Sequence, residues 1–296
     1  MAIVLALVLL GLPFVLSSFW LFVAVEVLVF ALYAVSFNVL LGYGGMLSFG
    51  HAAFFGVGGY AVAILMTRAR LPLAVAFVLA PVLAALAAAV VGFFSVRRTG
   101  IYFAMLTFAF QMLFYAIAMK ATALTGGDDG VSGITSGALR RPLVSYFFTL
   151  VLVSAALGLL YRVVESPFGY ALRALRANAR RAQYAGIDVR THQLAAFVLT
   201  GAFAGLAGAL FALSSGNVYP SWINWTASAT PVVMAVLGGI QSFVGPVVGA
   251  AVYVLLEVVI SGKTEYWPLV MGAIIVALVL LLPDGLAGVG RRLRGG

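Results

Sequence analysis

The residues of this sequence that could do chemistry are a few polar side chains inside long apolar runs. In the run from 100 to 120, Thr107, Gln111 and Tyr115 recur at every fourth position, which places them in one stripe along a helix. A buried amide without a hydrogen-bond partner is costly in an apolar environment, so this stripe must face protein or water. Interhelical hydrogen bonding and contact with a transported solute are both compatible with the pattern.

A second polar group lies in the stretch from 36 to 60, which contains FNVLLGYGGMLSFGHAAFFGVGGY. Such a density of glycine predicts a broken helix or very close backbone packing. At membrane depth, irregular backbone is tolerated only inside protein or beside a water-filled cavity. Helix packing and the lining of a transport pathway are therefore both open interpretations. The candidate pathway residues of the two groups are Asn38, Gly44, Gly45, Ser48, His51, Thr107, Gln111 and Tyr115.

The familiar patterns of catalytic and metal-binding sites do not occur in the sequence. It holds two histidines, His51 and His192, and no cysteine, which excludes disulfides, thiolate metal sites and Cys nucleophiles. The motifs G-x-S-x-G, H-E-x-x-H and G-x-x-x-x-G-K-[ST] are missing from it. These residues indicate a conduit or carrier and not an enzyme, with no cofactor or metal in this chain and any ATP hydrolysed by another one.

The composition defines the surroundings of these side chains. The 296 residues are 64% hydrophobic and only 8% charged, with a mean hydropathy of +1.16, whereas soluble domains carry about 25% charged residues. Chains that cross the bilayer must form helices or a closed barrel, and continuous apolar runs indicate helices. We therefore expect an all-α polytopic membrane protein, one domain over 1–296, with about ten transmembrane helices. The expected spans are 2–17, 19–41, 50–67, 72–94, 100–120, 143–164, 193–213, 227–243, 245–262 and 267–283.

The stretch from 165 to 192 is polar and basic, which predicts a connection on the water side of the membrane. Ser166 can cap a helix, Pro167 suits its first turn, and Gly186 can end it. The resulting helix is amphipathic, with a basic face beside the apolar one. The apolar face contains Phe168, Leu172, Leu175, Ala179 and Ala182, and the basic one Arg173, Arg176 and Arg180.

Two interpretations of this basic helix compete. It can lie on anionic lipid headgroups, as basic amphipathic helices commonly do. Alternatively, it docks into a groove on a cytoplasmic partner with Phe168 and Leu172 as anchors.

The positive charges also predict an orientation. The net charge of +9 sits in loops and tails, where lipid headgroups and membrane topology explain it without a nucleic-acid partner. Because ten is an even number of spans, both termini lie on the same side of the membrane, and the basic helix lies on that side too. That side receives Arg97, Arg98, Arg162, Arg173, Arg176, Arg180, Arg181, Arg190, Arg291, Arg292 and Arg294, and the other Arg68, Arg70, Lys120, Arg140, Arg141 and Lys263. The excess of Lys and Arg residues on the first side identifies it as the cytoplasmic side, and both termini are therefore expected in the cytoplasm.

The loop from 121 to 142 would then face outward. It is rich in glycine and has no calcium-loop spacing, so it reads either as a flexible loop or as a gate or docking surface for an outer partner. The residues proposed for that surface are Gly126, Gly127, Asp128, Asp129, Arg140 and Arg141.

Small residues four positions apart predict two close helix crossings. Gly201 and Gly205 form one such pair, and Gly245 and Gly249 form the other.

Acidic residues within the expected spans support an alternative class of protein. Glu26 and Glu257 lie in apolar runs, and intramembrane ionisable groups are typical of carriers driven by an ion gradient. Such a carrier would act without an ATPase, with His51 as a further candidate. A structural membrane subunit without its own pathway is a third possibility, although the polar stripe on the 100–120 helix argues against it.

Six strings, spread over most of the chain, match one known family in the same order. They are FNVLLGYGGMLSFGHAAFFGVGGYA (37–61), RTGIYFAMLTFAFQML (98–113), LTGGDDGVSGI (124–134), SPFGYALRALRAN (166–178), AFVLTGAFAGLAGALFAL (196–213) and VLGGIQSFVGPVVGA (236–250). Taken together they resemble the LivM-type permease subunits of bacterial branched-chain amino acid ABC importers.

The resemblance implies the many-helix fold similar to vitamin B12 and ribose importers, in the bacterial inner membrane. It implies two cytoplasmic ABC ATPase subunits that bind ATP and Mg, a second LivH-like permease, a periplasmic solute-binding protein and the lipid bilayer as partners. The helix in the 165–192 loop would couple this chain to the ATPases. The implied coupling residues are Ser166, Pro167, Phe168, Gly169, Leu172, Arg173, Arg176 and Arg180.

The sequence departs from the family pattern at two places. A carboxylate often precedes the VLGG string, and Thr230 stands there; a third glycine often follows, and Gln241 stands there. The first departure leaves the solute open between branched-chain amino acids and related small polar molecules such as urea or amides.

Overall fold

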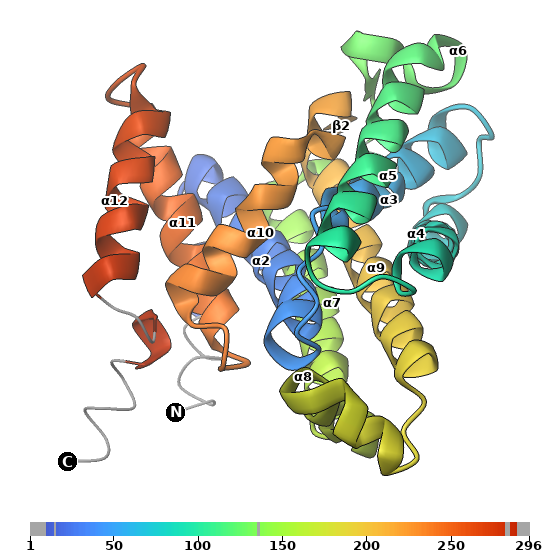
Figure 1. The fold of residues 1–296 in the computed structure, drawn as a ribbon. Coiled ribbons are helices and arrows are strands. Elements are labelled where there is room, and N and C mark those ends of the chain that lie inside the picture. The colour runs from blue at the N-terminus through green and yellow to red at the C-terminus, as the bar shows by residue number, and fades with distance from the viewer. Residues whose placement is uncertain (1–9, 15, 135–136, 282–284, 289–296) are drawn as a thin grey trace.

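The structure, a computed structural model, describes residues 10–14, 16–134, 137–281 and 285–288. Within these residues the chain is an all-α polytopic membrane protein. Most of its helices run between the upper and lower ends of the molecule as drawn in Figure 1. The long helices are α2 (Ser18–Asn38), α3 (His51–Thr67), α4 (Leu73–Ser95), α5 (Ile101–Lys120), α7 (Pro142–Val164), α9 (Val189–Ser215), α10 (Trp225–Gly238), α11 (Gly245–Ser261) and α12 (Trp267–Leu281).

These helices coincide with the expected spans from 19–41 onward, apart from shifts at their ends. Helices α2, α4, α5, α7 and α9 are long and apolar enough to cross a membrane, and a sixth candidate span, Trp267–Gly288, contains α12. Helices α3, α10 and α11 are shorter apolar helices. The expected span 2–17 lies mostly outside the described residues; the part that is described includes helical residues 10–11 and a 3-10 turn, η1 (Leu12–Phe14). The total of ten spans therefore stays a prediction.

The core is built from α3, α4 and α9, which cross at small residues. Gly58 of α3 lies against the backbone of Gly205, and Gly208 of α9 lies against the carbonyl of Phe55. A side chain at either glycine would overlap main-chain atoms, which cannot move aside. The predicted crossing at Gly201 and Gly205 is confirmed, because the Ala88 and Ala84 side chains of α4 pack directly against these two glycines.

The second predicted crossing is also present, between α10 and α11. Gly249 lies against the carbonyl of Met234, and Gly238 lies against that of Gly245. The turn between them places Gly239 at a φ of +107°. The glycines thus allow two short helices to pack backbone to backbone beside α2.

The segment 121–142, expected either as a flexible outer loop or as a gate or docking surface, folds into short elements where it is described: α6 (Thr122–Thr125), η3 (Gly127–Asp129), β1 (Val131–Ser132) and η4 (Gly137–Arg140). Strand β1 pairs antiparallel with β2 (Asn217–Val218), which joins this segment to the end of α9. The Thr125 hydroxyl donates to the Ala118 carbonyl at 2.6 Å and so closes the end of α5. Gly126 and Gly130 take the left-handed φ that these turns require.

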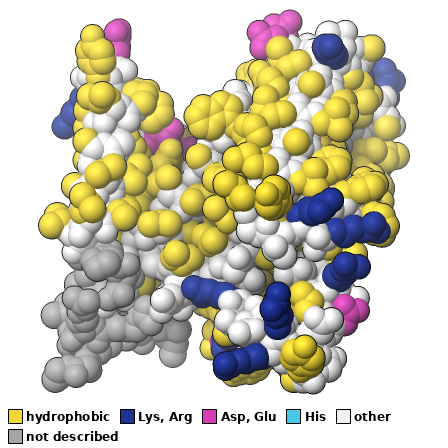
Figure 2. Space-filling view, viewed as in Figure 1, with side chains coloured by type: hydrophobic (Ala, Val, Ile, Leu, Met, Phe, Trp, Pro, Cys, Tyr) yellow, Lys and Arg dark blue, Asp and Glu magenta, His cyan; other side chains and the backbone are white. Residues whose placement is uncertain are grey.

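The opposite end of the molecule carries α8 (Pro167–Tyr184), which lies across the ends of neighbouring helices (Figure 1). Figure 2 shows that Lys and Arg side chains gather mainly at this end, whereas hydrophobic side chains cover the middle. This distribution agrees with helices that cross a bilayer and with a basic, water-side α8.

Candidate functional site

The glycine-rich stretch is a broken helix, as one of the two interpretations predicted. Helix α2 ends at Asn38 and continues as a π-helical turn, η2 (Val39–Tyr43). Residues 44–50 then run back without helical structure, and α3 begins at His51. Gly45 supports the reversal with a φ of +67°. The break therefore places an irregular backbone between two helices of the core.

A buried hydrogen-bond network joins this break to α5 and α10. The Gln111 amide donates to the Ile223 carbonyl at 2.8 Å and accepts the Ser228 hydroxyl at 2.6 Å. Ser228 in turn accepts the amide N–H of Ala52, at the start of α3, at 3.0 Å. The Phe49 amide donates to Thr107 at 3.2 Å. Thr107 and Gln111 of the polar stripe on α5 thus bond to other elements, as one of its two interpretations predicted, whereas Tyr115 is half-buried against a hydrophobic cluster.

The same region buries the polar side chains of the break itself. The His51 ring lies 3.1 Å from the Ser36 hydroxyl through Nε2 and stacks on Tyr33, with 5.5 Å between ring centroids. Ser48 accepts the Gly50 amide at 3.2 Å. Within the described chain, Asn38 Oδ1 and His51 Nδ1 are buried without a hydrogen-bond partner. An orphaned buried polar atom is costly, so these two atoms are candidates for new contacts in another conformation.

Replacing Gln111 with Leu should lower stability strongly, because its amide serves both Ile223 and Ser228. The substitution keeps the volume but leaves the Ile223 carbonyl without a donor and the Ser228 hydroxyl without an acceptor, at about 1–3 kcal/mol each. We expect a clear drop in the melting temperature of the detergent-purified protein. Ser228→Ala removes the same shared bond and also the acceptor of the Ala52 amide, so the double variant should lose more stability than Gln111→Leu alone but less than the sum of the two single losses. Full additivity in this double-mutant cycle would contradict the network.

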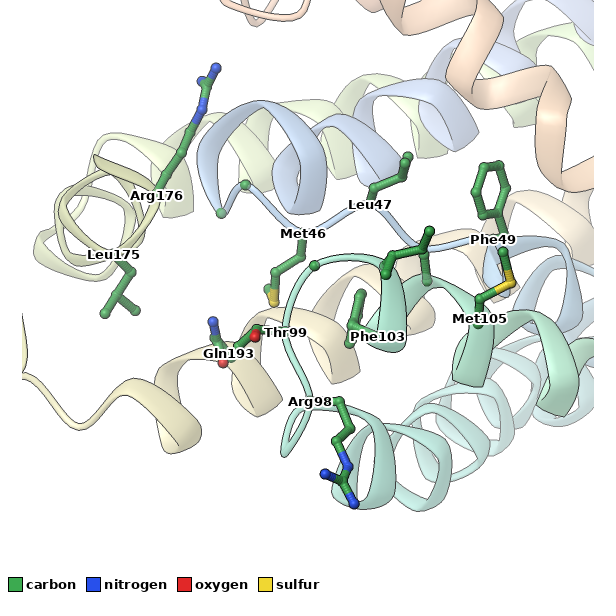
Figure 3. Close-up of a pocket in the computed structure, with 15 residues that line it drawn as sticks. Met46, Leu47, Phe49, Arg98, Thr99, Phe103, Met105, Leu175, Arg176 and Gln193 are labelled. Atoms are coloured by element: carbon green, nitrogen blue, oxygen red, sulfur yellow. The ribbon is translucent and has the colours of Figure 1, made fainter. Parts of the chain in front are cut away.

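A cavity of about 500 Å³ lies beside the broken helix, on the side toward α8. The backbone of residues 44–49 forms one wall, the α4–α5 turn and the start of α5 form another, and Leu175 and Gln193 close it. Figure 3 shows Met46 pointing toward Thr99 and Gln193, while Arg98 and Arg176 point away from the centre. Of the predicted pathway residues, Gly44 and Gly45 line this cavity; the fully buried Thr107 and Gln111 do not.

The apolar face of α8 packs on the chain itself. Leu172 and Leu175 are 1% and 5% exposed and belong to the main core cluster. Gly169 lies against the Val164 carbonyl, and the Phe168 ring stacks on His192 with centroids 5.7 Å apart. Leu172 therefore cannot reach a partner and instead holds α8 in place. For the same reason this face is not free to insert into lipid.

The predicted continuous helix is broken at Asn178, which is a correction to the expected pattern. Asn178 has extended backbone (φ −162°, ψ 101°), and its side chain accepts the Arg181 amide at 3.0 Å. Asn thus caps a second short helical segment, a role that it commonly takes. The break shifts the helical register, so Ala179 is exposed instead of continuing the apolar face.

Two arginines on α8 contact the broken helix. The Arg176 guanidinium donates to the Gly42 carbonyl in the π-helical turn, and its side-chain carbons lie where a Cβ on Gly45 would go. Arg173 pairs with Glu165 at 2.7 Å and lies over the Tyr43 ring at 5.0 Å. Movement of α8 would therefore reach the 44–50 segment directly.

The outward face of α8 is a set of residues that sequence reasoning missed. It consists of Tyr170, Ala174 and Ala177, all exposed and at helical spacing before the break at Asn178. Small residues at its centre permit close approach by another surface. The sequence did contain a signal, because these residues lie on the side of the helix opposite its apolar face. The prediction instead selected the neighbouring basic residues, such as Arg173 and Arg176.

Comparison with known proteins gives consistent matches. Residues 19–279 match the family model described as the permease component of the branched-chain amino acid transport system. The chain is 28% identical to the high-affinity branched-chain amino acid transport system permease protein LivM of Escherichia coli strain K12, over 93% of this chain and 71% of that one. LivM of Salmonella typhimurium strain LT2 is 27% identical over the same shares. LivH of E. coli strain K12 is 30% identical over 47% of this chain and 46% of its own. No solved structure matches the chain.

Proposed function

The chain belongs to the family of permease components of branched-chain amino acid transport systems, so it is a membrane permease subunit and not an enzyme; from this premise we propose that it forms half of the translocation pathway of an ATP-driven importer. The observation that carries the proposal is the contact between α8 and the broken helix. Arg176 and Gly45 join a water-exposed helix to irregular backbone beside a cavity. This is the arrangement needed to couple an external motor to a pathway inside the membrane.

The α8 end faces the cytoplasm in this proposal, and both termini lie on that side. Two ABC ATPase subunits, which bind ATP and Mg, dock on the 165–192 loop, and a second LivH-like permease completes the membrane pair. The coupling residues divide into two roles. Tyr170, Ala174 and Ala177 meet the ATPase, whereas predicted residues before the break at Asn178 hold or position the helix: Ser166, Pro167, Phe168, Gly169, Leu172, Arg173 and Arg176. Arg180, the remaining predicted coupling residue, is exposed beyond that break.

The transported solute is a branched-chain amino acid or a related small polar molecule, as the names of the relatives suggest. The wall formed by Gly44 and Gly45 is the part of the predicted pathway that borders a cavity in this conformation. The buried residues Asn38, Ser48, His51, Thr107 and Gln111 support the broken helix from behind and become accessible only if it moves. Tyr115 is half-buried in another part of the core and stays a predicted pathway residue. The overall fold would be that of the vitamin B12 and ribose importers, with ten spans in the bacterial inner membrane.

A periplasmic solute-binding protein delivers the solute to the opposite end. Asp128 and Asp129 are exposed there on a braced turn, which suits a docking surface better than a flexible loop would. Gly126 and Gly127 shape that turn, and Arg140 and Arg141 lie in the same 121–142 segment.

Co-purification tests the proposed assembly. The tagged chain is extracted from native membranes in several mild detergents, and the co-eluting proteins are identified. The proposal expects a nucleotide-binding ATPase and a second permease in stoichiometric amounts. Recovery of this chain alone in every detergent would favour the gradient-driven carrier, in which Glu26, His51 and Glu257 were the candidate residues.

Arg176→Met should uncouple ATP hydrolysis from transport without unfolding the protein. The aliphatic part of the side chain still covers Gly45, but the hydrogen bond to the Gly42 carbonyl is lost. We expect ATPase activity to persist in the purified complex while solute uptake falls at least tenfold. Arg162→Met, at a basic residue near the same end, is the control. Equal uptake by both variants would show that the Arg176 bond does not transmit motion.

A further inference from the structure

A polar groove lies beside α8 and adjoins the cavity of the broken helix, with which it shares Thr99 and Gln193. It has a volume of about 750 Å³ and is bordered by the α4–α5 turn, the second segment of α8 and the first turn of α9. Its hydrogen-bond donors come from all three elements. They are Arg97, Thr99, Arg180, Gln183, Arg190 and Gln193.

The groove is positively charged, and its arginines have no counter-ion. Arg97, Arg180 and Arg190 form no ion pair among the described residues. Asp188 also borders the groove, but its carboxylate caps α9: it accepts the Arg190 and Thr191 amides at 3.1 and 3.3 Å and the Thr191 hydroxyl at 2.6 Å. Three guanidinium groups from three elements are thus left to bind an anion.

The position of the groove identifies the source of that anion. Helix α4 ends at Ser95 and α9 begins at Val189, so the groove lies where two membrane-crossing helices reach water. The Arg97 guanidinium packs on the Phe93 ring at 4.3 Å. Phe93 and Phe94 are about half exposed on the apolar surface of α4. A ligand here would have its anionic group among the arginines and its apolar part along the phenylalanines.

We propose that this groove binds the phosphate headgroup of an anionic phospholipid, with an acyl chain lying along Phe93 and Phe94. Arginine suits the role because its planar guanidinium donates two parallel hydrogen bonds to phosphate oxygens. Basic pockets between helices on the cytoplasmic side commonly hold such headgroups. A soluble ATPase fits this groove less well, because Arg97 at its border packs on Phe93, which belongs to the exposed apolar surface of α4. The bound lipid would connect α4 and α9 to α8, the proposed coupling helix.

Native mass spectrometry of the full-length chain, purified with its bound subunits in mild detergent, tests the site. The probe is phosphatidylglycerol, titrated against phosphatidylcholine. The groove variant is Arg97→Gln/Arg180→Gln/Arg190→Gln. The control, Arg68→Gln/Lys120→Gln/Lys263→Gln, removes the same charge at the opposite end. Each arginine near an anionic lipid contributes about fivefold in affinity, so we expect about a hundredfold weaker phosphatidylglycerol binding in the groove variant and little change in the control.

Three results would overturn the proposal. Equal loss of phosphatidylglycerol in both variants would show general charge attraction. Equal binding of phosphatidylglycerol and phosphatidylcholine by the wild-type protein would show that the headgroup charge is not recognised. Displacement of phosphatidylglycerol by water-soluble glycerol phosphate at equal concentration would show that the acyl chain contributes nothing. A charge-preserving variant, Arg97→Lys/Arg180→Lys/Arg190→Lys, should keep most of the binding, which separates lipid loss from misfolding.

Discussion

Replacing Gly208 with Val should prevent the core from forming. The added side chain would start inside the carbonyl of Phe55 on α3, and a neighbouring main-chain atom cannot rotate out of the way. Separating α3 from α9 would also open the contacts at Gly58 and Gly205, along the same crossing. Overpacking of one side chain costs about 1–3 kcal/mol, and a clash with main chain should exceed that range. We expect the variant to be absent from the monodisperse peak in size-exclusion chromatography.

Gly158→Ala provides the matched control for this experiment. Gly158 is also a helical glycine in a membrane-crossing helix, α7, but nothing lies within 4 Å of the position that a Cβ would take. Alanine is favoured over glycine in a helix by about 1 kcal/mol, so the control should be as stable as the wild-type protein or more so. A well-folded Gly208→Val protein would mean that α3 and α9 do not cross as closely as described.

Placing a charge on the outward face of α8 should abolish transport without unfolding the chain. Ala177 is exposed on the same face as Ala174, where the proposed ATPase contact requires a small side chain. Ala177→Glu would place a bulky side chain in that contact, beside Arg173 and Arg176, and overpacking of one side chain costs about 1–3 kcal/mol. We expect solute uptake to fall at least tenfold and the ATPase to be lost on purification, while the melting temperature of the permease stays unchanged.

Ala185→Glu makes the same substitution at an exposed position in the same loop, beyond the break at Asn178. It should retain uptake and the ATPase. Wild-type uptake in the Ala177 variant would exclude the outward face as the docking surface. Leu172 is unsuitable for this test, because a charge there would enter the core of the chain and destabilise it.

The helices were predictable because lipid-crossing segments must be apolar along their whole length. The break at residues 44–50 was predictable for a related reason, since so much glycine weakens a helix. The crossings at Gly201 and Gly249 followed from small-residue spacing. Each of these signals is local, so the sequence contains it within a few neighbouring residues.

The contacts between distant residues were not predictable. The stripe on α5 required polar partners, but nothing in the sequence connects Gln111 to Ser228, which lies 117 residues away. The amphipathic pattern of α8 showed that one face is covered, but not that Leu172 and Leu175 are covered by the chain itself. The break at Asn178 was missed because its cap depends on a bond to Arg181 that has no periodic signal.

The proposal that this permease is driven by ATP is tested most directly by reconstitution. The chain, its co-purifying permease and the ATPase are placed in liposomes with the solute-binding protein outside, and uptake of labelled leucine is measured with ATP enclosed. We predict uptake that requires enclosed ATP, is insensitive to an uncoupler and is lost with Ala177→Glu. Uptake by this chain alone, without ATP and abolished by the uncoupler, would contradict the account.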